Sequence, residues 1–291
     1  MSELRKRMIG ELRLRNRSDR TIESYVGAVY RLAKHYKQSP DLLDLEQIRG
    51  FLTHLAVDRG LSPSTVNVAF NAIVFLYREV LGRRLDLSGI QRPRTRKKLP
   101  KAYAQGDTLR LLEAARGGPP AARVFLLAVY SGGLRLAEAC ALRWAHLEFE
   151  RGMLRVDNGK GGKDRYLPLS PVLARELLPR RGPAAPSDPV FPSSHRDRSR
   201  PISDATGRRH YNLAVEAAGI GRLGGIHCLR HSYATHQIER GVDINTLSKL
   251  MGHSSVKTTM LYLHVAKARP LQAGTPLEDL YPEPGDKGGN P

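Results

Sequence analysis

Cysteine is nearly absent from this chain, and its scarcity excludes two kinds of stabilising framework. Only Cys140 and Cys228 occur among the 291 residues, and no second pair stands at metal-site spacing. The sequence therefore supports neither a set of disulfides nor a zinc finger. We expect both cysteines to be small buried residues.

Long apolar segments and a secretion signal are also lacking. The longest purely apolar run, Val124–Tyr130, is far shorter than the roughly 20 residues that a membrane-spanning helix needs. Residues 1–15 alternate leucine with arginine and lack the continuous apolar region of a signal peptide. No lipidation signal or basic amphipathic anchor stands out. These absences predict a cytoplasmic protein without a membrane partner.

Acidic residues are few relative to basic ones. The chain has 28 aspartates and glutamates against 47 lysines and arginines, which gives a formal net charge of +19. An excess of this size makes the positive charges of the folded protein repel one another. It therefore favours a partner that neutralises them, a polyanion and above all nucleic acid. With 41% apolar residues, the chain is long enough for two domains that each have a buried core.

The first ninety residues have the pattern of a helical domain. Ser18 precedes an acidic helix start, and apolar residues then recur at helical spacing. Ser62 and Pro63 form a stronger start signal, with serine as the N-cap and proline in the first helical position. We expect four helices in a domain that spans residues 1–90.

Helical periodicity stops between residues 91 and 102, where arginine, lysine and proline dominate. A basic segment between two apolar-patterned blocks predicts a linker that lies along phosphates, although a nuclear-localisation signal or a disordered tail has the same composition. The candidate DNA-binding residues of this linker are Arg92, Arg94, Arg96, Lys97 and Lys98.

Residues 103–268 have the pattern of a second, mainly helical domain. Helices are predicted at about 106–116, 120–131, 203–218, 228–240, 244–252 and 256–264, with a further helix beginning near Arg135. The final residues, 269–291, predict a loose tail in which Leu277–Tyr281 is the apolar cluster.

One hairpin interrupts the helices of this second domain. Two strand-like runs, 153–157 and 165–169, flank a glycine-rich turn and predict a small antiparallel sheet. A nucleotide-binding P-loop is excluded, because Asp157 stands where its first glycine is required. Asp164 likewise follows Lys163 where a serine or threonine would hold magnesium.

Two motifs carry arginines suited to breaking a phosphodiester bond. A tyrosine that attacks phosphorus creates a doubly charged phosphorane, which permanently charged, forked guanidiniums neutralise best. Arg135 follows a glycine pair at a helix start, and Glu138 lies one turn on, where it can orient that arginine. His227 and Arg230 lie three apart and face the same way. This chemistry needs no metal and no nucleotide, so we expect no cofactor.

The order of these motifs resembles that of tyrosine recombinases, the family of phage integrases, integron integrases and Xer proteins. The last motif places Tyr262 nine residues after His253. The run from Phe51 to Val80 is also similar to the core-binding helical domain of that family. The segments that match in order and approximate spacing are 132–138, 159–169, 227–236 and 250–265.

The resemblance implies DNA strand cleavage by Tyr262. Arg135 and Arg230 would clamp the scissile phosphate while the tyrosine attacks it, which yields a 3′-phosphotyrosyl link and a free 5′ hydroxyl. A second strand's hydroxyl can then reverse the step, so exchange rather than hydrolysis follows. Four other tyrosines lack this context and are expected to pack in the protein: Tyr130, Tyr166, Tyr211 and Tyr233.

The resemblance also implies roles for the remaining polar residues. Lys160 would protonate the 5′ oxygen, and Lys163 competes for that role and is otherwise a DNA-binding candidate. His227 would assist proton transfer to and from the tyrosine, and His253 would hydrogen-bond a non-bridging oxygen. The residues expected to support this set are Glu138 and His231.

The expected architecture is a mainly α, two-domain DNA clamp. A helical N-terminal core-binding domain and a mainly α catalytic domain with a small antiparallel sheet would close around a double-stranded DNA recombination site. The resemblance implies a homo-oligomer, with a tetramer in the synapse. It leaves open whether Tyr262 attacks within its own protomer's site or a neighbour's, and Leu277–Tyr281 is the candidate segment for docking on a neighbour.

Three alternative functions fit the sequence less well. An architectural DNA-binding protein would explain the charge but not the six catalytic candidates. A type IB topoisomerase shares the chemistry, but the two-domain size and the integrase-like N-terminal helices argue against it. His227 and His231 have the spacing of a helical zinc site, yet Cys228 stands where a metalloprotease has its general base.

Overall fold

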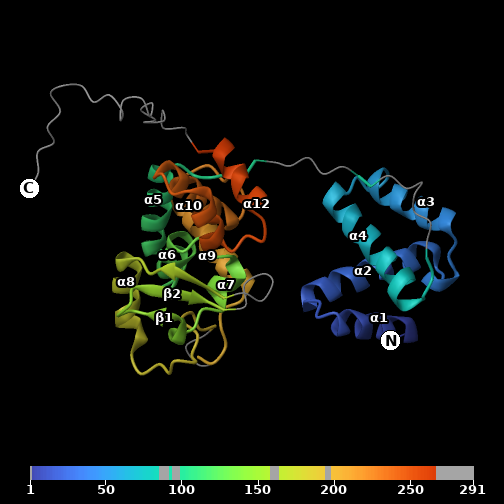
Figure 1. Cartoon of the computed structure of the whole chain (residues 1–291), viewed down its shortest axis with the longest axis horizontal. Helices are drawn as coiled ribbons and strands as arrows, with labels where there is room; N and C mark the ends of the chain where they lie inside the picture. The colour runs from blue at the N-terminus through green and yellow to red at the C-terminus, as the bar shows by residue number, and fades with distance from the viewer. Residues whose placement is uncertain (1, 85–91, 94–98, 158–163, 194–197, 267–291) are drawn as a thin grey trace, which may run out of the picture. The chain divides into compact units, whose positions relative to one another are not determined.

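The computed structural model describes residues 2–84, 92–93, 99–157, 164–193 and 198–266 of the chain. It divides into two compact units, residues 1–97 and 98–291. The described residues are mostly helical and contain one three-stranded antiparallel sheet (Figure 1). No described helix is both long enough and apolar enough to cross a membrane.

The first unit contains the four α-helices expected from its sequence. Ser18 and Ser62 each accept a hydrogen bond from the backbone amide three residues on, as N-caps do, and Pro63 opens its helix. A π-helical turn, Leu76–Val80, continues the last helix. The α-helices are α1 (Glu3–Leu14), α2 (Asp19–Tyr36), α3 (Leu45–Ala56) and α4 (Pro63–Phe75), with a 3-10 turn at Pro40–Leu42.

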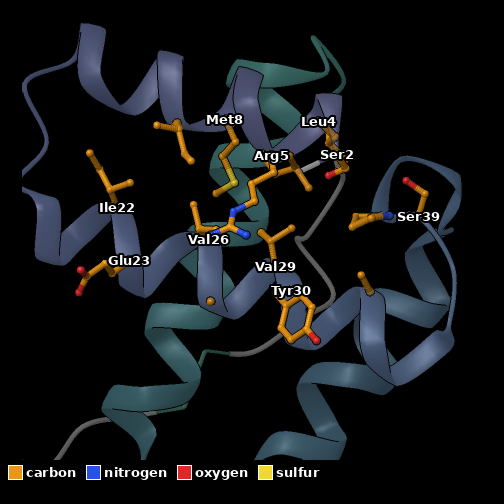
Figure 2. A pocket seen from close by; sticks show the side chains of 15 residues that line it. Ser2, Leu4, Arg5, Met8, Ile22, Glu23, Val26, Val29, Tyr30 and Ser39 are labelled. Carbon is orange, nitrogen blue, oxygen red and sulfur yellow. The ribbon is translucent and has the colours of Figure 1, made fainter.

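An apolar groove of about 490 Å³ lies between α1 and α2 of this unit (Figure 2). Met8, Val26, Val29 and Tyr30 are among the residues that line it. Arg5 is the only cation in its lining, so the groove lacks the paired guanidiniums that phosphoryl transfer needs.

The second unit begins with helices α5 (Gln105–Ala114), α6 (Ala122–Ser131) and α7 (Leu136–Cys140). The later helices are α8 (Pro171–Arg181), α9 (Asp204–Ala217), α10 (His227–Glu239), α11 (Ile244–Met251) and α12 (Val256–Met260). Short 3-10 turns occupy Ala115–Gly117, Trp144–His146 and Leu261–His264. The helix predicted over 256–264 is therefore one α-helical turn followed by a 3-10 turn.

The sheet confirms the predicted hairpin and adds one strand. β2 (Met153–Val156) pairs antiparallel with β3 (Arg165–Pro168), and Leu154 lies opposite Leu167 so that both side chains enter the core. The added strand β1, Leu147–Glu148, is only two residues long and has no alternation that the sequence could display.

Helix α6 is the centre of the core in the second unit. Eight consecutive residues, 122–129, are buried, because α5, α8, α9 and α10 pack around the helix. Phe125 contacts Phe191 edge to face at a centroid distance of 5.2 Å. Cys140 and Cys228 are free and buried, as expected.

Two side chains of helix α10 hydrogen-bond the backbone amide and the backbone carbonyl of one residue, Tyr103, near the start of the second unit. The Tyr103 amide donates to Ser232 Oγ at 2.8 Å, and its carbonyl accepts from His236 Nε2 at 3.0 Å. Because Nε2 carries the proton, His236 Nδ1 accepts the hydroxyl of Tyr130 at 2.9 Å. The polar groups of α10 thus fix the first residue after the predicted linker.

Several residues singled out in the sequence lie outside the described residues. They are Arg94, Arg96, Lys97, Lys98, Lys160, Lys163 and the segment Leu277–Tyr281. Arg92 is described: its guanidinium carbon lies 4.3 Å from the ring centre of Phe70, a cation–π contact. Asn67 Nδ2 donates to the carbonyl of Pro93 at 3.1 Å, so this part of the predicted linker lies against α4.

Four tyrosines are expected to pack inside the protein, and the expectation is confirmed for Tyr211 and Tyr233, which are buried. Tyr130 is partly buried against the core. The expectation is wrong for Tyr166, which is 45% exposed, because strand alternation turns it away from the face that Leu167 buries.

Candidate active site

Glu138 is the centre of the polar cluster in the second unit. Its Oε2 accepts the backbone amide of Arg135 at 2.8 Å, and its Oε1 accepts Arg135 Nη1 at 2.6 Å. The contact suggested by their spacing is therefore present. Gly133 makes the preceding turn with φ +54°, and a Cβ there would collide with the ring of Tyr233. Glycine at this position lets Arg135 begin α7 close to α10.

A third arginine, Arg165, completes the environment of Glu138. Its Nη1 and Nη2 donate to the two carboxylate oxygens at 3.0 and 2.8 Å, and its side chain is only 9% exposed. Burial by itself raises the pKa of Glu138, but Arg165 and Arg135 outweigh burial and bring that pKa to about 2. The motifs in the sequence do not single out Arg165. The available signal was an arginine opening the strand that follows the glycine-rich turn.

Arg230 lies deeper than Arg135 and is held by backbone atoms. Its Nη1 donates to the carbonyl of Gly133, and its Nη2 donates to the carbonyl of Met251 at 2.5 Å. Nη1 also lies 4.0 Å from Glu138 Oε2. Burial and then the charge of Arg135 lower the pKa of Arg230 to about 10, so the guanidinium stays protonated at neutral pH.

Three consecutive carbonyls at the end of α11 each accept one of these arginines. Arg165 Nε donates to residue 250, Arg230 Nη2 to residue 251 and Arg135 Nη2 to residue 252, at 2.8, 2.5 and 2.7 Å. The last carbonyls of a helix have no intrahelical partner and carry partial negative charge, so they suit guanidiniums. Gly252 ends the helix with φ +59°.

Tyr262 is buried beside this arginine cluster. Its hydroxyl lies 2.9 Å from His231 Nδ1, and its ring is stacked on that of His253 with an interplanar angle of 8° and a centroid distance of 6.4 Å. Burial raises the pKa of Tyr262, and the charges of Arg230 and Arg135 act against that rise. The tyrosine therefore lies beside the arginine cluster of its own chain.

His231, rather than His227, makes the hydrogen bond to the tyrosine hydroxyl. Burial lowers the pKa of His231 to about 4, helped by His227 and Arg230, so the ring is neutral at physiological pH. His227 is the first residue of α10 and is exposed. Partial desolvation of the ring by the surrounding protein, and then the positive charges of Arg230 and Arg135, lower the pKa of His227.

His253 bridges the arginine cluster to the segment that carries the tyrosine. Its Nε2 lies 3.2 Å from Arg230 Nη2 and its Nδ1 lies 2.8 Å from Thr259 Oγ1. Because a guanidinium only donates, Nε2 accepts and Nδ1 carries the proton. Burial and then Arg230 lower the pKa of His253 to about 4. Among the described residues, no group of three or more histidine, cysteine or acidic side chains is arranged to hold a metal ion.

Comparison with known families identifies this arrangement. The family model described as "Phage integrase family" matches residues 104–269, more than half of the chain. A second family model, described as "Phage integrase, N-terminal SAM-like domain", matches residues 4–87. The chain belongs to the phage integrase family. As a member of this family, it is a tyrosine-type site-specific DNA recombinase.

Relatives of this integrase-family chain align over nearly its whole length. An integrase/recombinase of Escherichia coli is 33% identical over 323 residues and covers 97% of this chain and 94% of that protein. Tyrosine recombinase XerA of Pyrococcus furiosus is 32% identical over 267 residues, with 91% and 90% covered. A lambda integrase dimer bound to a COC′ core site shares the fold: the TM-score is 0.72 at 18% identity, over 94% of this chain and 98% of that one.

Proposed function

We propose that Tyr262 is the nucleophile with which this recombinase cleaves duplex DNA, and that it attacks within the site of its own protomer. The observation that carries the proposal is the position of its hydroxyl. That group is buried, hydrogen-bonded to a neutral histidine, and close enough to Arg230 and Arg135 for their charges to favour the phenolate.

The first step transfers one proton and exchanges one bond. The hydroxyl of Tyr262 gives its proton to His231 Nδ1 as its oxygen attacks phosphorus, and the bond between phosphorus and the 5′ oxygen breaks. The products are a 3′-phosphotyrosyl link and a 5′ hydroxyl. A neutral His231 suits this role because a protonated ring has no free lone pair at Nδ1.

The scissile phosphate is held by Arg135 and Arg230. Each guanidinium has five N–H donors, and the carbonyl and carboxylate contacts described above leave others for the non-bridging oxygens. His253 adds a donor to the same phosphate once it carries a proton on Nε2. His227, at the exposed start of α10, assists proton transfer near the phosphate.

The leaving 5′ oxygen needs a proton, and we assign that proton to Lys160. The assignment rests on the position of Lys160 in the glycine-rich turn between β2 and β3, a turn that lies outside the described residues. Attack by another strand's 5′ hydroxyl on the phosphotyrosyl link, with Lys160 now accepting the proton, reverses the step and joins new partners. No net hydrolysis takes place.

The proposed substrate is a double-stranded recombination site, and the proposed active form is a tetramer. A solved lambda integrase tetramer is bound to a Holliday junction, and its fold is that of this chain. Because DNA is the substrate, we place the reaction in the cytoplasm. The net charge of +19 supports binding dominated by phosphate contacts. The candidate contacts are Arg92, Arg94, Arg96, Lys97, Lys98 and Lys163.

The experiment that tests the proposal uses a nicked suicide duplex, from which the leaving strand diffuses away. The wild-type protein is expected to form a detergent-stable protein–DNA adduct. Tyr262→Phe should bind the same DNA without forming it, and an adduct from this variant would refute the assignment. Relaxation of supercoils by a monomer, with no joint product from two sites, would favour a type IB topoisomerase instead.

A further inference from the structure

Arg165 differs from the other two arginines of the site in where its donors go. All three of its nitrogens contact protein acceptors, namely both oxygens of Glu138 and the carbonyl of Leu250. The side chain is 9% exposed, against 24% for Arg135. Arg230 is 5% exposed, but it contacts protein carbonyls through Nη1 and Nη2, whereas Arg165 also uses its Nε. Arg165 is thus turned toward the protein, whereas Arg135 retains surface that a phosphate can reach.

The contacts of Arg165 fix the two groups that orient the clamp arginines. Its paired bonds hold both oxygens of Glu138, which binds Arg135. Its Nε holds the carbonyl immediately before the two that bind Arg230 and Arg135. A forked guanidinium fixes the plane of a carboxylate, which a single ammonium does not.

The charge of Arg165 matters as well as its geometry. Glu138 lies within 4.0 Å of Arg165, Arg135 and Arg230, so one negative charge is shared among three positive ones. Arg165 compensates that carboxylate and leaves two positive charges in excess, which matches the two negative charges that develop on the phosphorane. Without Arg165, Glu138 would oppose the charge of the clamp.

We propose that Arg165 is a positioning residue that sets the geometry and charge of the Arg135–Arg230 clamp through Glu138 and the end of α11. The inference rests on the proposed function, because it assumes that this clamp neutralises the scissile phosphate. It assigns Arg165 no contact with DNA, so its loss slows strand cleavage without weakening DNA binding.

The test compares Arg165→Lys, which keeps the charge but loses the fork, with the matched control Arg155→Lys. Arg155 lies on the neighbouring strand and pairs with Asp157, away from Glu138. At saturating protein, Arg165→Lys is expected to cleave the suicide duplex on the order of 10²-fold more slowly, with unchanged Kd and unchanged salt dependence of binding. Arg155→Lys should cleave at the wild-type rate.

Two modified substrates separate a clamp defect from other defects. A methylphosphonate at the scissile position removes one negative charge, so it should shrink the ratio of wild-type to Arg165→Lys rates to within about tenfold. A 5′-thiolate leaving group needs no proton, so it should leave that ratio unchanged. Rescue by the thiolate alone would overturn the proposal, as would a lower salt slope, because Arg165 would then act on the leaving group or on DNA.

A double-mutant cycle with Glu138→Gln tests whether Arg165 acts through the carboxylate of Glu138, and the unchanged Kd of each variant for DNA establishes that it is folded. Once Glu138 is neutral, Arg165→Lys should add little further loss of cleavage, because the two residues act as a unit. Losses that multiply would overturn the inference. An adduct that forms normally on Tyr262 in Arg165→Lys also overturns it and leaves the proposed function intact, whereas an adduct from Tyr262→Phe removes the proposed function itself.

Discussion

The hydroxyl of Tyr262 lies 2.9 Å from Nδ1 of His231, on a helix that also carries Arg230. The pairing joins an acid whose pKa is raised by burial to a base whose pKa is lowered by burial to about 4. Both groups are therefore neutral at rest. In the proposed mechanism the proton moves to His231 as the oxygen attacks phosphorus, and the charges of Arg230 and Arg135 favour that transfer.

Replacing His231 should impair cleavage more than replacing His227. His231→Ala removes the acceptor of the tyrosine proton, and loss of a positioned base costs on the order of 10²-fold or more in rate. His227→Ala is the matched control, because it removes an exposed histidine from the same helix. It should reduce the rate of cleavage less than His231→Ala does. Single-turnover adduct formation measures both variants, and a larger loss in His227→Ala would make His227 the base.

Cleavage within one protomer predicts the behaviour of mixed oligomers. Tyr262→Phe and Arg135→Ala each lack one component of a site, and neither should cleave alone. If each tyrosine serves its own site, mixing the two variants restores no activity, because no protomer holds both components. Recovered adduct formation in the mixture would show that the tyrosine is donated to a neighbour.

Stability should fall as the pH falls from about 6.5 toward 4. His231 and His253 have folded pKa values of about 4, below the ordinary value of about 6.5, so the unfolded chain binds more protons in this window. Their contribution is complete above pH 6.5 and is lost on acidification, on the order of 1–3 kcal/mol in total. Urea unfolding across this range checks the slope, and His231→Asn should flatten it.

Glu138→Gln should destabilise the second unit by about 3–5 kcal/mol, because it leaves buried guanidiniums without their counter-charge. DNA binding should persist, since the phosphate supplies negative charge at the same place. Thermal unfolding with and without DNA measures this, and DNA should raise the variant's Tm more than that of the wild type. Equal rises would contradict the shared role of Glu138 and phosphate.

Gly252→Ala should cost stability and activity together. Its φ of +59° disfavours a side chain by roughly 1–2 kcal/mol, and a Cβ would lie 3.0 Å from Arg165 Nη1. Gly219→Ala is the matched control, with φ +60° and nothing within 4 Å. Both variants should lose similar stability from strain, but only Gly252→Ala should also cleave more slowly. Equal cleavage rates in the two variants would show that the turn at Gly252 does not affect the arginine clamp.

Local signals predicted the contacts that span one helical turn. The spacing of Arg135 and Glu138 was enough to suggest their ion pair, and the serine caps at positions 18 and 62 set two helix starts. Helix α8 escaped prediction because Pro179 stands inside it and it buries only Leu173 and Leu177. Propensity and periodicity are weak guides to such a helix.

The long-range contacts could not be predicted in this way. Arg165 meets Glu138 across 27 residues of sequence, and nothing in the strand pattern marks its side chain as buried. The sequence pattern allows either His227 or His231 to contact Tyr262. Which of them does so depends on how the 3-10 turn after α12 packs on α10. Only the packed structure supplies that information.

The row of carbonyls that ends α11 has a consequence for which mutations the site tolerates. Main-chain oxygens at positions 250–252 are present whatever side chains those positions carry. Substitutions at Leu250 or Met251 therefore leave these three arginine-holding hydrogen bonds in place, provided that the last helical turn survives. Mutations that damage the clamp are instead expected at the arginines themselves, at Glu138 and His253, and at the glycine turns of residues 133 and 252.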